Sequence, residues 1–202
     1  MGPWVITSWQ RKEGWTMPTT NAQDLFVYEL RDLYDAEHKF LEGQQEMVQE
    51  ATDQKLEKSI QEHIEQTRLH IRNLELVFER LDRQPQRQTS HVAQWLVNEA
   101  RQSIQGAQND AVRDCAINAA VIKVEHFEMG SYRTMFTGAQ LMGRTEIANL
   151  LEQNMRQEEE AARIAERSVA ELLQKAQPTK EQGEQEGLID KAKGKLNELR
   201  GQ

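Results

Sequence analysis

Six ionisable side chains occupy positions where a helical bundle should be apolar, and together they suit a pair of divalent cations. A charged group in a core costs on the order of several kcal/mol unless a partner neutralises it. Carboxylates bridge two cations, and neutral imidazoles complete the coordination spheres while leaving positions open for an oxygen species. We therefore predict a centre for two divalent metal ions, iron or manganese, held by Glu37, His63, His70, Glu125, Glu128 and Glu158.

The six positions share a depth along the predicted helices. The four long helices are centred near positions 37, 67, 126 and 160, and each of the six lies within about one turn of a centre. Solvated side chains would instead gather near helix ends. Glu37 alone would be explained by pairing with an arginine or by reaching water, but the coincidence across four helices favours a shared site.

The spacing of the histidines leaves two arrangements open. His63 and His70 are seven residues apart, so they share a helix face and lie roughly 10 Å apart along its axis. They would serve one metal each, or one would be a ligand while the other orients a carboxylate. Glu125 and Glu128, at i and i+3, are the pair expected to bridge the metals.

Three further side chains are predicted to lie beside the ligands. They are Tyr34, Thr67 and Tyr132, each about one turn from a candidate ligand. A tyrosine there would hydrogen-bond a ligand or serve as a packed aromatic with a satisfied hydroxyl. Common di-iron bundles carry Glu-x-x-His on two helices, whereas this chain has Glu-x-x-Glu on one helix and both histidines on another. The spacing assigns no catalytic residue.

The helices that must position these groups follow from apolar residues at steps of three and four. A short extra helix carries Val92 and Ile104 and ends near Gly106, Gly143 breaks the chain again, and Thr145 is expected to cap the last helix. Long helices are predicted over about 21–51, 53–81, 110–141 and 145–176.

The connections predict the topology. Tight turns join the first pair and the last pair of long helices, whereas about 28 residues, 82–109, link the two pairs. A tight turn makes neighbours antiparallel, and a long link can cross the bundle from end to end. We therefore predict an all-α, ferritin-like four-helix bundle over 21–176, with one long crossover carrying the short extra helix. Flexible tails are expected at 1–20 and 177–202.

Composition excludes several classes of protein. The chain has 33 acidic and 25 basic side chains, a net charge of −8, which argues against a nucleic-acid binder or an anionic-membrane binder. A single cysteine, Cys115, excludes an intramolecular disulfide and fits a reducing compartment. No apolar run is long enough to span a membrane, and the tryptophan-containing start lacks the pattern of a signal peptide. The expected location is the cytoplasm.

Three segments of the chain resemble the YciE/YciF-like bacterial stress proteins, a family with a ferritin-like fold. They are Tyr-Glu-Leu-Arg-Asp-Leu-Tyr-Asp-Ala-Glu at 28–37, His-Ile-Glu-Gln-Thr at 63–67, and Glu-His-Phe-Glu at 125–128 followed by Tyr132. The resemblance covers about 21–176. It implies a di-metal centre in a homodimer rather than a storage cage. The metal region of the family matches Glu37, His63, Glu125, Glu128 and Glu158.

The resemblance also has limits along the chain. Acidic residues are frequent in that family where this chain has Gln66 and Arg163, which would remove a further ligand here. The segment 188–195, Leu-Ile-Asp-Lys-Ala-Lys-Gly-Lys, is weakly similar to the Lys-Gly repeats of CsbD-like stress proteins.

Two functions follow as hypotheses. The first is a di-metal protein of the bacterial stress response that acts on dioxygen or peroxide, or that oxidises ferrous iron. The second is a metal-free or structurally metallated helical dimer that acts as a stress interaction protein, with the midplane groups forming a hydrogen-bonded network. A ferritin-type iron store would require a closed shell of subunits. Whether the protein turns over a substrate stays open.

Overall fold

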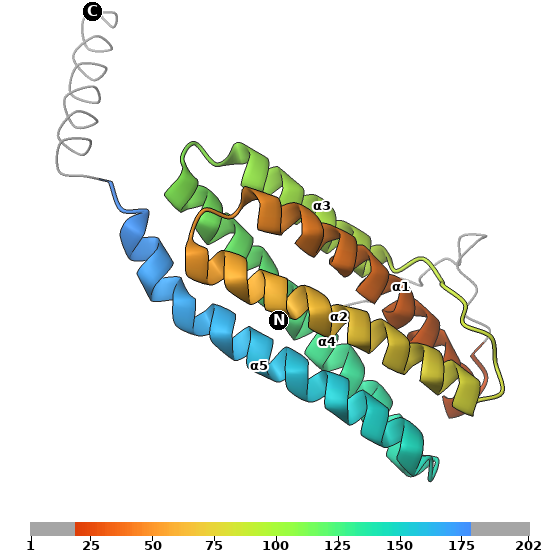
Figure 1. The fold of residues 1–202 in the computed structure, drawn as a ribbon. Coiled ribbons are helices and arrows are strands. Elements are labelled where there is room, and N and C mark those ends of the chain that lie inside the picture. Colours follow the sequence, from red (N-terminus) through yellow and green to blue (C-terminus); the bar gives the residue numbers. More distant parts are fainter. Residues whose placement is uncertain (1–18, 179–202) are drawn as a thin grey trace, which may run out of the picture.

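A computed structural model describes residues 19–178 of the chain (Figure 1). Within this range the chain forms helices joined by turns and loops, and the predicted long helices and short extra helix are all present. The expected tails, 1–20 and 177–202, lie almost entirely outside the described residues. The helices are α1 (Ala22–Glu50), α2 (Gln54–Arg80), α3 (His91–Gly106), α4 (Asp110–Leu141) and α5 (Thr145–Lys175).

Short polar side chains set the beginnings of three of these helices. The side chain of Asn21 accepts a hydrogen bond from the backbone N–H of Asp24 at the start of α1. Asp53 caps α2, and Asn109 caps α4 in the same way. Each cap satisfies backbone donors that have no partner inside the helix.

The start of α5 differs from the prediction. Thr145 is the first helical residue rather than the cap, and Arg144 occupies the cap position without a side-chain hydrogen bond. Gly143 adopts a φ of +67°, a left-handed conformation that glycine enters without a steric penalty. This glycine lets the chain reverse tightly between α4 and α5.

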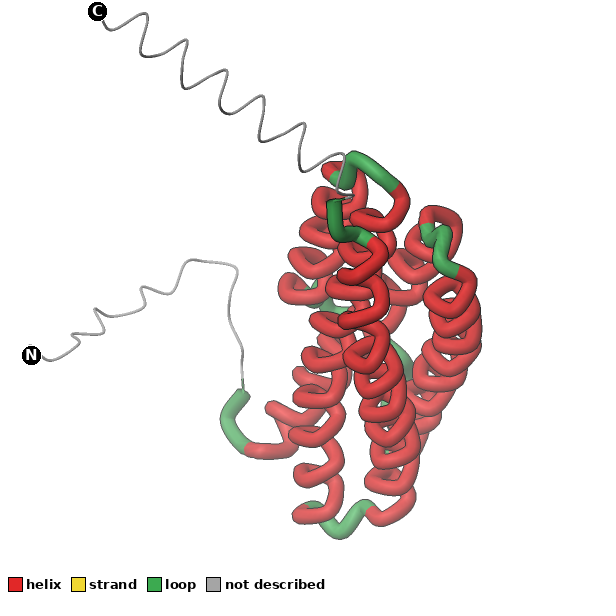
Figure 2. Tube along the Cα trace, turned by 90° about the vertical axis from the view of Figure 1, so that its left-hand side faces the viewer, coloured by secondary structure: helices red, strands yellow, loops and turns green. Residues whose placement is uncertain are grey.

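The order of the helices in space is that of a ferritin-like bundle. Contacts join α1 to α2, α4 to α5, α1 to α4 and α2 to α5, while α3 lies against α1 and α4. At one end of the bundle Asp114 accepts hydrogen bonds from the N–H and hydroxyl of Thr52 in the α1–α2 turn, at 2.8 and 2.7 Å. At the other end Arg80 pairs with Glu146, at 2.8 Å. Hence α2 and α4 start at the same end, and the link that carries α3 crosses the whole bundle (Figures 1 and 2).

A buried carboxylate fastens this crossover to α1. Asp35 accepts hydrogen bonds from the backbone N–H of Ser90 and from Arg87 Nε, both at 2.8 Å. The link is therefore held by specific contacts just before α3 begins.

Two apolar clusters fill the bundle on either side of its middle. One cluster includes Leu30, Phe78 and Met135, and the other includes Met47, Leu56 and Ile117. The predicted polar positions lie between them. None of the helices in the described range is both long and apolar enough to cross a membrane.

Candidate metal centre

All six predicted ligands meet in the interior of the bundle. Glu37 comes from α1, the two histidines from α2, Glu125 and Glu128 from α4, and Glu158 from α5. His63 is 6% exposed, and each of the other five is at most 1% exposed. Ionisable groups at this depth need a partner that balances their charge.

The donor atoms form two overlapping groups. In the first, atoms of His63, Glu125, Glu128 and Glu158 lie within 4.8 Å of one another. In the second, atoms of Glu37, His70 and Glu158 satisfy the same limit. Each group is compact enough to hold one cation, and Glu158 belongs to both.

Glu158 points one oxygen at each histidine. Its Oε2 lies 3.4 Å from His63 Nε2, and its Oε1 lies 2.7 Å from His70 Nδ1. The two imidazole rings are 6.2 Å apart between centroids. Helix α5 packs beside α2, so this carboxylate falls between the two imidazoles of α2. The shared position therefore belongs to Glu158 rather than to the expected pair on α4, both of whose carboxylates lie in the first group.

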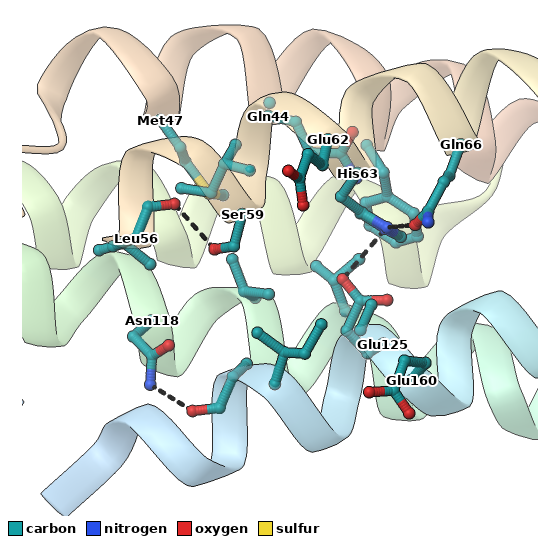
Figure 3. A pocket seen from close by; sticks show the side chains of 18 of the residues that line it. Gln44, Met47, Leu56, Ser59, Glu62, His63, Gln66, Asn118, Glu125 and Glu160 are labelled. Carbon is teal, nitrogen blue, oxygen red and sulfur yellow. Dashed lines mark hydrogen bonds and ion pairs between the residues drawn. The ribbon is translucent and has the colours of Figure 1, made fainter. Parts of the chain in front are cut away.

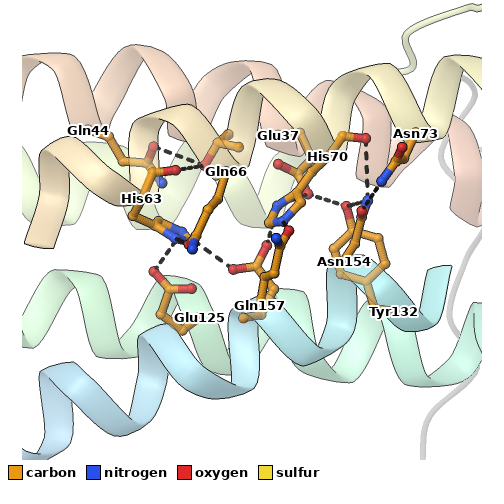
Figure 4. Close-up of polar contacts among 12 residues, drawn as sticks. Glu37, Gln44, His63, Gln66, His70, Asn73, Glu125, Tyr132, Asn154 and Gln157 are labelled. Atoms are coloured by element: carbon orange, nitrogen blue, oxygen red, sulfur yellow. Dashed lines mark hydrogen bonds and ion pairs between the residues drawn. The ribbon is translucent and has the colours of Figure 1, made fainter. Parts of the chain in front are cut away.

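Each imidazole donates a hydrogen bond to the amide oxygen of a neighbouring glutamine, which favours one tautomer of the ring (Figure 4). His63 Nδ1 lies 3.0 Å from Gln66 Oε1, and His70 Nε2 lies 2.8 Å from Gln157 Oε1. An amide oxygen only accepts, so each of these ring nitrogens carries the hydrogen. In the neutral ring the other nitrogen then bears a lone pair. Both lone pairs face carboxylate oxygens, an arrangement that a bound cation would stabilise.

Several donor atoms in the centre are buried without a hydrogen-bond partner. Buried polar atoms normally have such partners, because desolvation without compensation is costly. Oxygen and imidazole nitrogen atoms are the ligands that iron and manganese accept. The residues therefore fit a pair of such ions. The unpartnered atoms are Oε2 of Glu37, Nε2 of His63, Nδ1 of His70, Oε2 of Glu125, and both carboxylate oxygens of Glu128 and of Glu158.

Crowding of carboxylates raises the proton affinity of this centre. Burial raises the pKa of Glu128 well above its usual range, and the charges of Glu158, Glu37 and Glu125 raise it further. Burial and the neighbouring carboxylates raise the pKa of Glu158 in the same way. For His70, burial lowers the pKa, but the charge and hydrogen bonding of Glu37, the charge of Glu128 and the hydrogen bond to Gln157 together outweigh burial, and the pKa is raised. The metal-free centre would hold protons that divalent cations could replace.

Tyr132 lies beside a candidate ligand, where it was expected. Its buried hydroxyl donates a hydrogen bond to Glu37 Oε1 and accepts one from Asn154 Nδ2 at 3.0 Å. Asn154 Oδ1 in turn accepts from Asn73 Nδ2 at 2.7 Å. This chain of hydrogen bonds fixes the Oε1 atom of Glu37 and connects α1, α2, α4 and α5.

The other two predicted neighbours make different contacts. The Thr67 hydroxyl lies 3.1 Å from both Gln44 Oε1 and the backbone oxygen of His63. The Tyr34 hydroxyl donates to Glu75 at 2.9 Å. Neither hydroxyl hydrogen-bonds to a metal-ligating side-chain atom of the six, since Thr67 reaches only the backbone of His63. Three residues turn a helix by about 300°, so Tyr34 points roughly 60° away from the direction of Glu37.

The described region coincides with a known family. Residues 21–179 match the family described as Domain of unknown function (DUF892). The chain belongs to this family. It is 31% identical over 137 residues to Protein YciF of Escherichia coli K12, an alignment that covers 67% of this chain and 82% of YciF.

Two solved structures share the fold of this chain. The crystal structure of the E. coli stress protein YciF superposes with a TM-score of 0.74 at 26% identity, covering 78% of this chain and 99% of that one. YcfI from Rhodopseudomonas palustris superposes with a TM-score of 0.73 at 28% identity, covering 75% and 96%. These likenesses confirm the ferritin-like bundle and the YciE/YciF-like resemblance of this DUF892 chain.

Sequence reasoning missed the polar residues that surround the candidate ligands. Asn154 precedes Glu158 by four residues on the same stripe, and Gln66 follows His63 by three, so the helical period could have found both. Gln157 had no such signal. It is adjacent to Glu158 in the sequence and reaches His70 only because α5 packs on α2.

Proposed function

We propose that this DUF892 protein is a di-metal carboxylate protein of the bacterial stress response. It would bind two iron or manganese ions and act on dioxygen or peroxide, or oxidise ferrous iron. The observation that carries the proposal is the position of Glu158, whose two unpartnered oxygens face two imidazole lone pairs. The description of E. coli YciF as a stress protein supports the physiological setting.

Each ion would have its own set of side chains. Glu37 and His70 would hold one ion, and His63, Glu125 and Glu128 would hold the other, with Glu158 shared. Such a metal pair supplies Lewis acidity and exchangeable electrons, the chemistry required for reactions at an O–O bond or for ferrous oxidation.

The remaining residues of the site would prepare the ligands. Gln66 and Gln157 keep the imidazole hydrogens away from the centre, so that the lone pairs face inward. Tyr132 holds one oxygen of Glu37 and leaves the other free. The two apolar clusters on either side of the centre limit the access of bulk water, and this strengthens electrostatic interactions in the site.

We also propose that the protein is a homodimer and does not assemble into a ferritin-type shell of subunits. Size-exclusion chromatography with light scattering would give a mass near twice 23.4 kDa. A shell of many subunits would instead favour an iron store.

The second candidate is a helical interaction protein without functional metal. The hydrogen-bonded chain of Tyr132, Asn154 and Asn73 favours it, because such a network can specify how helices pack without any cation. This candidate predicts that chelators leave the melting temperature unchanged.

Metal content distinguishes the two candidates. Elemental mass spectrometry of protein purified without a chelator or a metal-affinity column should find about two iron or manganese ions per chain. Glu128→Ala should reduce the content while the helical circular dichroism persists. Glu159→Ala is the matched control, because Glu159 pairs with Arg133 at the surface, at 2.8 Å. If no metal binds even after anaerobic loading with ferrous or manganous ions, the proposal is wrong.

A further inference from the structure

A cavity adjoins one half of the candidate metal centre (Figure 3). It has a volume of about 70 Å³ between α1, α2, α4 and α5, with Val97 of α3 also in its wall, and it reaches His63 and Glu125. Glu37, His70 and Tyr132 do not line it, and all three are fully buried. Most of its wall is apolar, including Phe40, Met47, Leu56, Ile60, Val121 and Val124.

One polar group in this wall lacks a partner. Gln44 is 5% exposed, and its Oε1 is 3.1 Å from the hydroxyl of Thr67. Its Nε2 is buried without a hydrogen-bond partner. A buried amide N–H in an apolar wall is costly unless something accepts its hydrogen bond. An acceptor atom on a molecule in the cavity would satisfy it.

The charges nearest the outer end of the cavity are already paired. Glu62 of α2 and Glu160 of α5 line this end and are exposed. Glu62 lies 3.6 Å from Lys58, and Glu160 lies 3.4 Å from Arg163 and 3.0 Å from Arg167. Because each carboxylate has a cationic neighbour on its own helix, the entrance favours an uncharged molecule over a cation or an anion.

We propose that this cavity binds a small uncharged molecule with an apolar body and one hydrogen-bond acceptor, held by Gln44 on the His63 side of the centre. A water molecule needs roughly 10–15 Å³ of such volume, so the cavity has room for a body of about four carbon atoms. A short alkyl hydroperoxide has this size and polarity, whereas hydrogen peroxide lacks the apolar body.

The assignment of a hydroperoxide rests on the proposed function. Reduction of an alkyl hydroperoxide breaks its O–O bond and consumes two electrons and two protons, giving an alcohol and water. The electrons would come one each from two ferrous or manganous ions. The ion held by Glu37 and His70 would then lie where the hydroperoxide in the cavity does not reach it.

Binding is tested on metal-free protein, kept in EDTA, with two redox-inert probes. Xenon tests for the apolar body, and tert-butanol tests for the apolar body together with the acceptor. Saturable NMR shifts of the methyl groups that line the cavity should appear with each probe, and xenon should compete with tert-butanol. Absence of saturable binding at these methyl groups in the native chain would overturn the proposal.

Three variants assign the contacts. Ala161→Phe should fill the cavity and abolish the binding of both probes, because Ala161 lines it. Gln44→Met should keep xenon and weaken tert-butanol about fivefold, the effect of one neutral hydrogen bond. Gln45→Met, at the exposed neighbouring position, is the control and should behave as the native chain. If Ala161→Phe fails to fold, the comparison of Gln44→Met with Gln45→Met still tests the proposal. Equal affinity of these two variants for tert-butanol would refute the role of Gln44.

The outcome is separable from that of the proposed function. If two metal ions bind per chain and neither probe enters, the cavity proposal alone is wrong. If the probes bind and no metal does, the proposed function is wrong and the hydroperoxide assignment falls with it.

Discussion

Glu158→Gln is the substitution that most directly tests the shared carboxylate. Glutamine keeps the shape of the side chain but removes the charge between His63 and His70. Its amide can donate a hydrogen bond to either ring lone pair. Glu159→Gln is the matched control on the adjacent position, because Glu159 pairs with Arg133 outside the centre.

The expected effect on stability depends on the metal. A free ion concentration of 100 times Kd stabilises by about 2.7 kcal/mol per site, hence about 5 kcal/mol for two sites. In a domain of this size each kcal/mol shifts Tm by about 2–4 °C, so metal should raise the Tm of the native chain by about 10–20 °C. Because Glu158 belongs to both groups, Glu158→Gln should reduce this increase to under about 5 °C.

Without metal, Glu158→Gln should no longer have a lower melting temperature than the native chain. Without a cation, Glu158 is a buried carboxylate whose pKa is raised by burial and by the charge of Glu125. Such a group either takes up a proton or remains a buried charge without compensation, and replacing it by a neutral side chain of the same shape is neutral or stabilising. Metal-free Glu158→Gln should therefore melt at the same temperature as the native chain or above it.

Scanning calorimetry at pH 7, in EDTA and then with manganous ions, measures both effects. If Glu158→Gln lowers Tm equally with and without metal, the carboxylate is part of a structural network and the bridging argument is refuted. If the metal-induced increase is unchanged, Glu158 is no ligand. Glu159→Gln should retain the native increase.

Three further predictions follow from the same geometry. The raised pKa values of Glu128 and Glu158 mean that the folded metal-free protein keeps protons on these groups that the unfolded chain releases. Their contribution to stability should be greatest below about pH 4.5 and fall as pH rises toward the folded-state values, so urea titrations in EDTA should show a smaller loss of stability with rising pH for Glu158→Gln than for the native chain. Gln157→Met removes the acceptor for His70 Nε2 and should weaken metal binding about 10–100-fold by competition with a fluorescent chelator, with helix content unchanged. Asp114→Ala removes a buried acceptor that holds the α1–α2 turn and should cost about 2–3 kcal/mol in urea denaturation, without changing metal content.

The bundle could be predicted because its determinants are local or periodic. Apolar steps of three and four defined the long helices, and Asn21 and Asp53 marked two of their starts. The unequal loop lengths then left one long crossover as the topology that fits. The prediction failed at Thr145, because the turn at left-handed Gly143 places Arg144 at the cap position, so that Thr145 is already the first helical residue.

The polar neighbours of the centre were harder to predict because they act across helices. The stripe positions of Glu37 and Tyr132 placed both inside the bundle, but not the hydrogen bond between them. The contact of Gln157 with His70 depends on how α5 lies against α2, which no spacing within one helix expresses.

The order of residues along the chain was enough to establish an all-α, ferritin-like bundle with six ionisable side chains at its midplane, because the helical period decides which face each residue occupies. Tertiary packing alone decided that Glu158, rather than Glu125 and Glu128, lies between the two histidines. It also decided that a cavity reaches only the His63 side. Both depend on the rotation and separation of neighbouring helices, which are set by how side chains from different helices fit together.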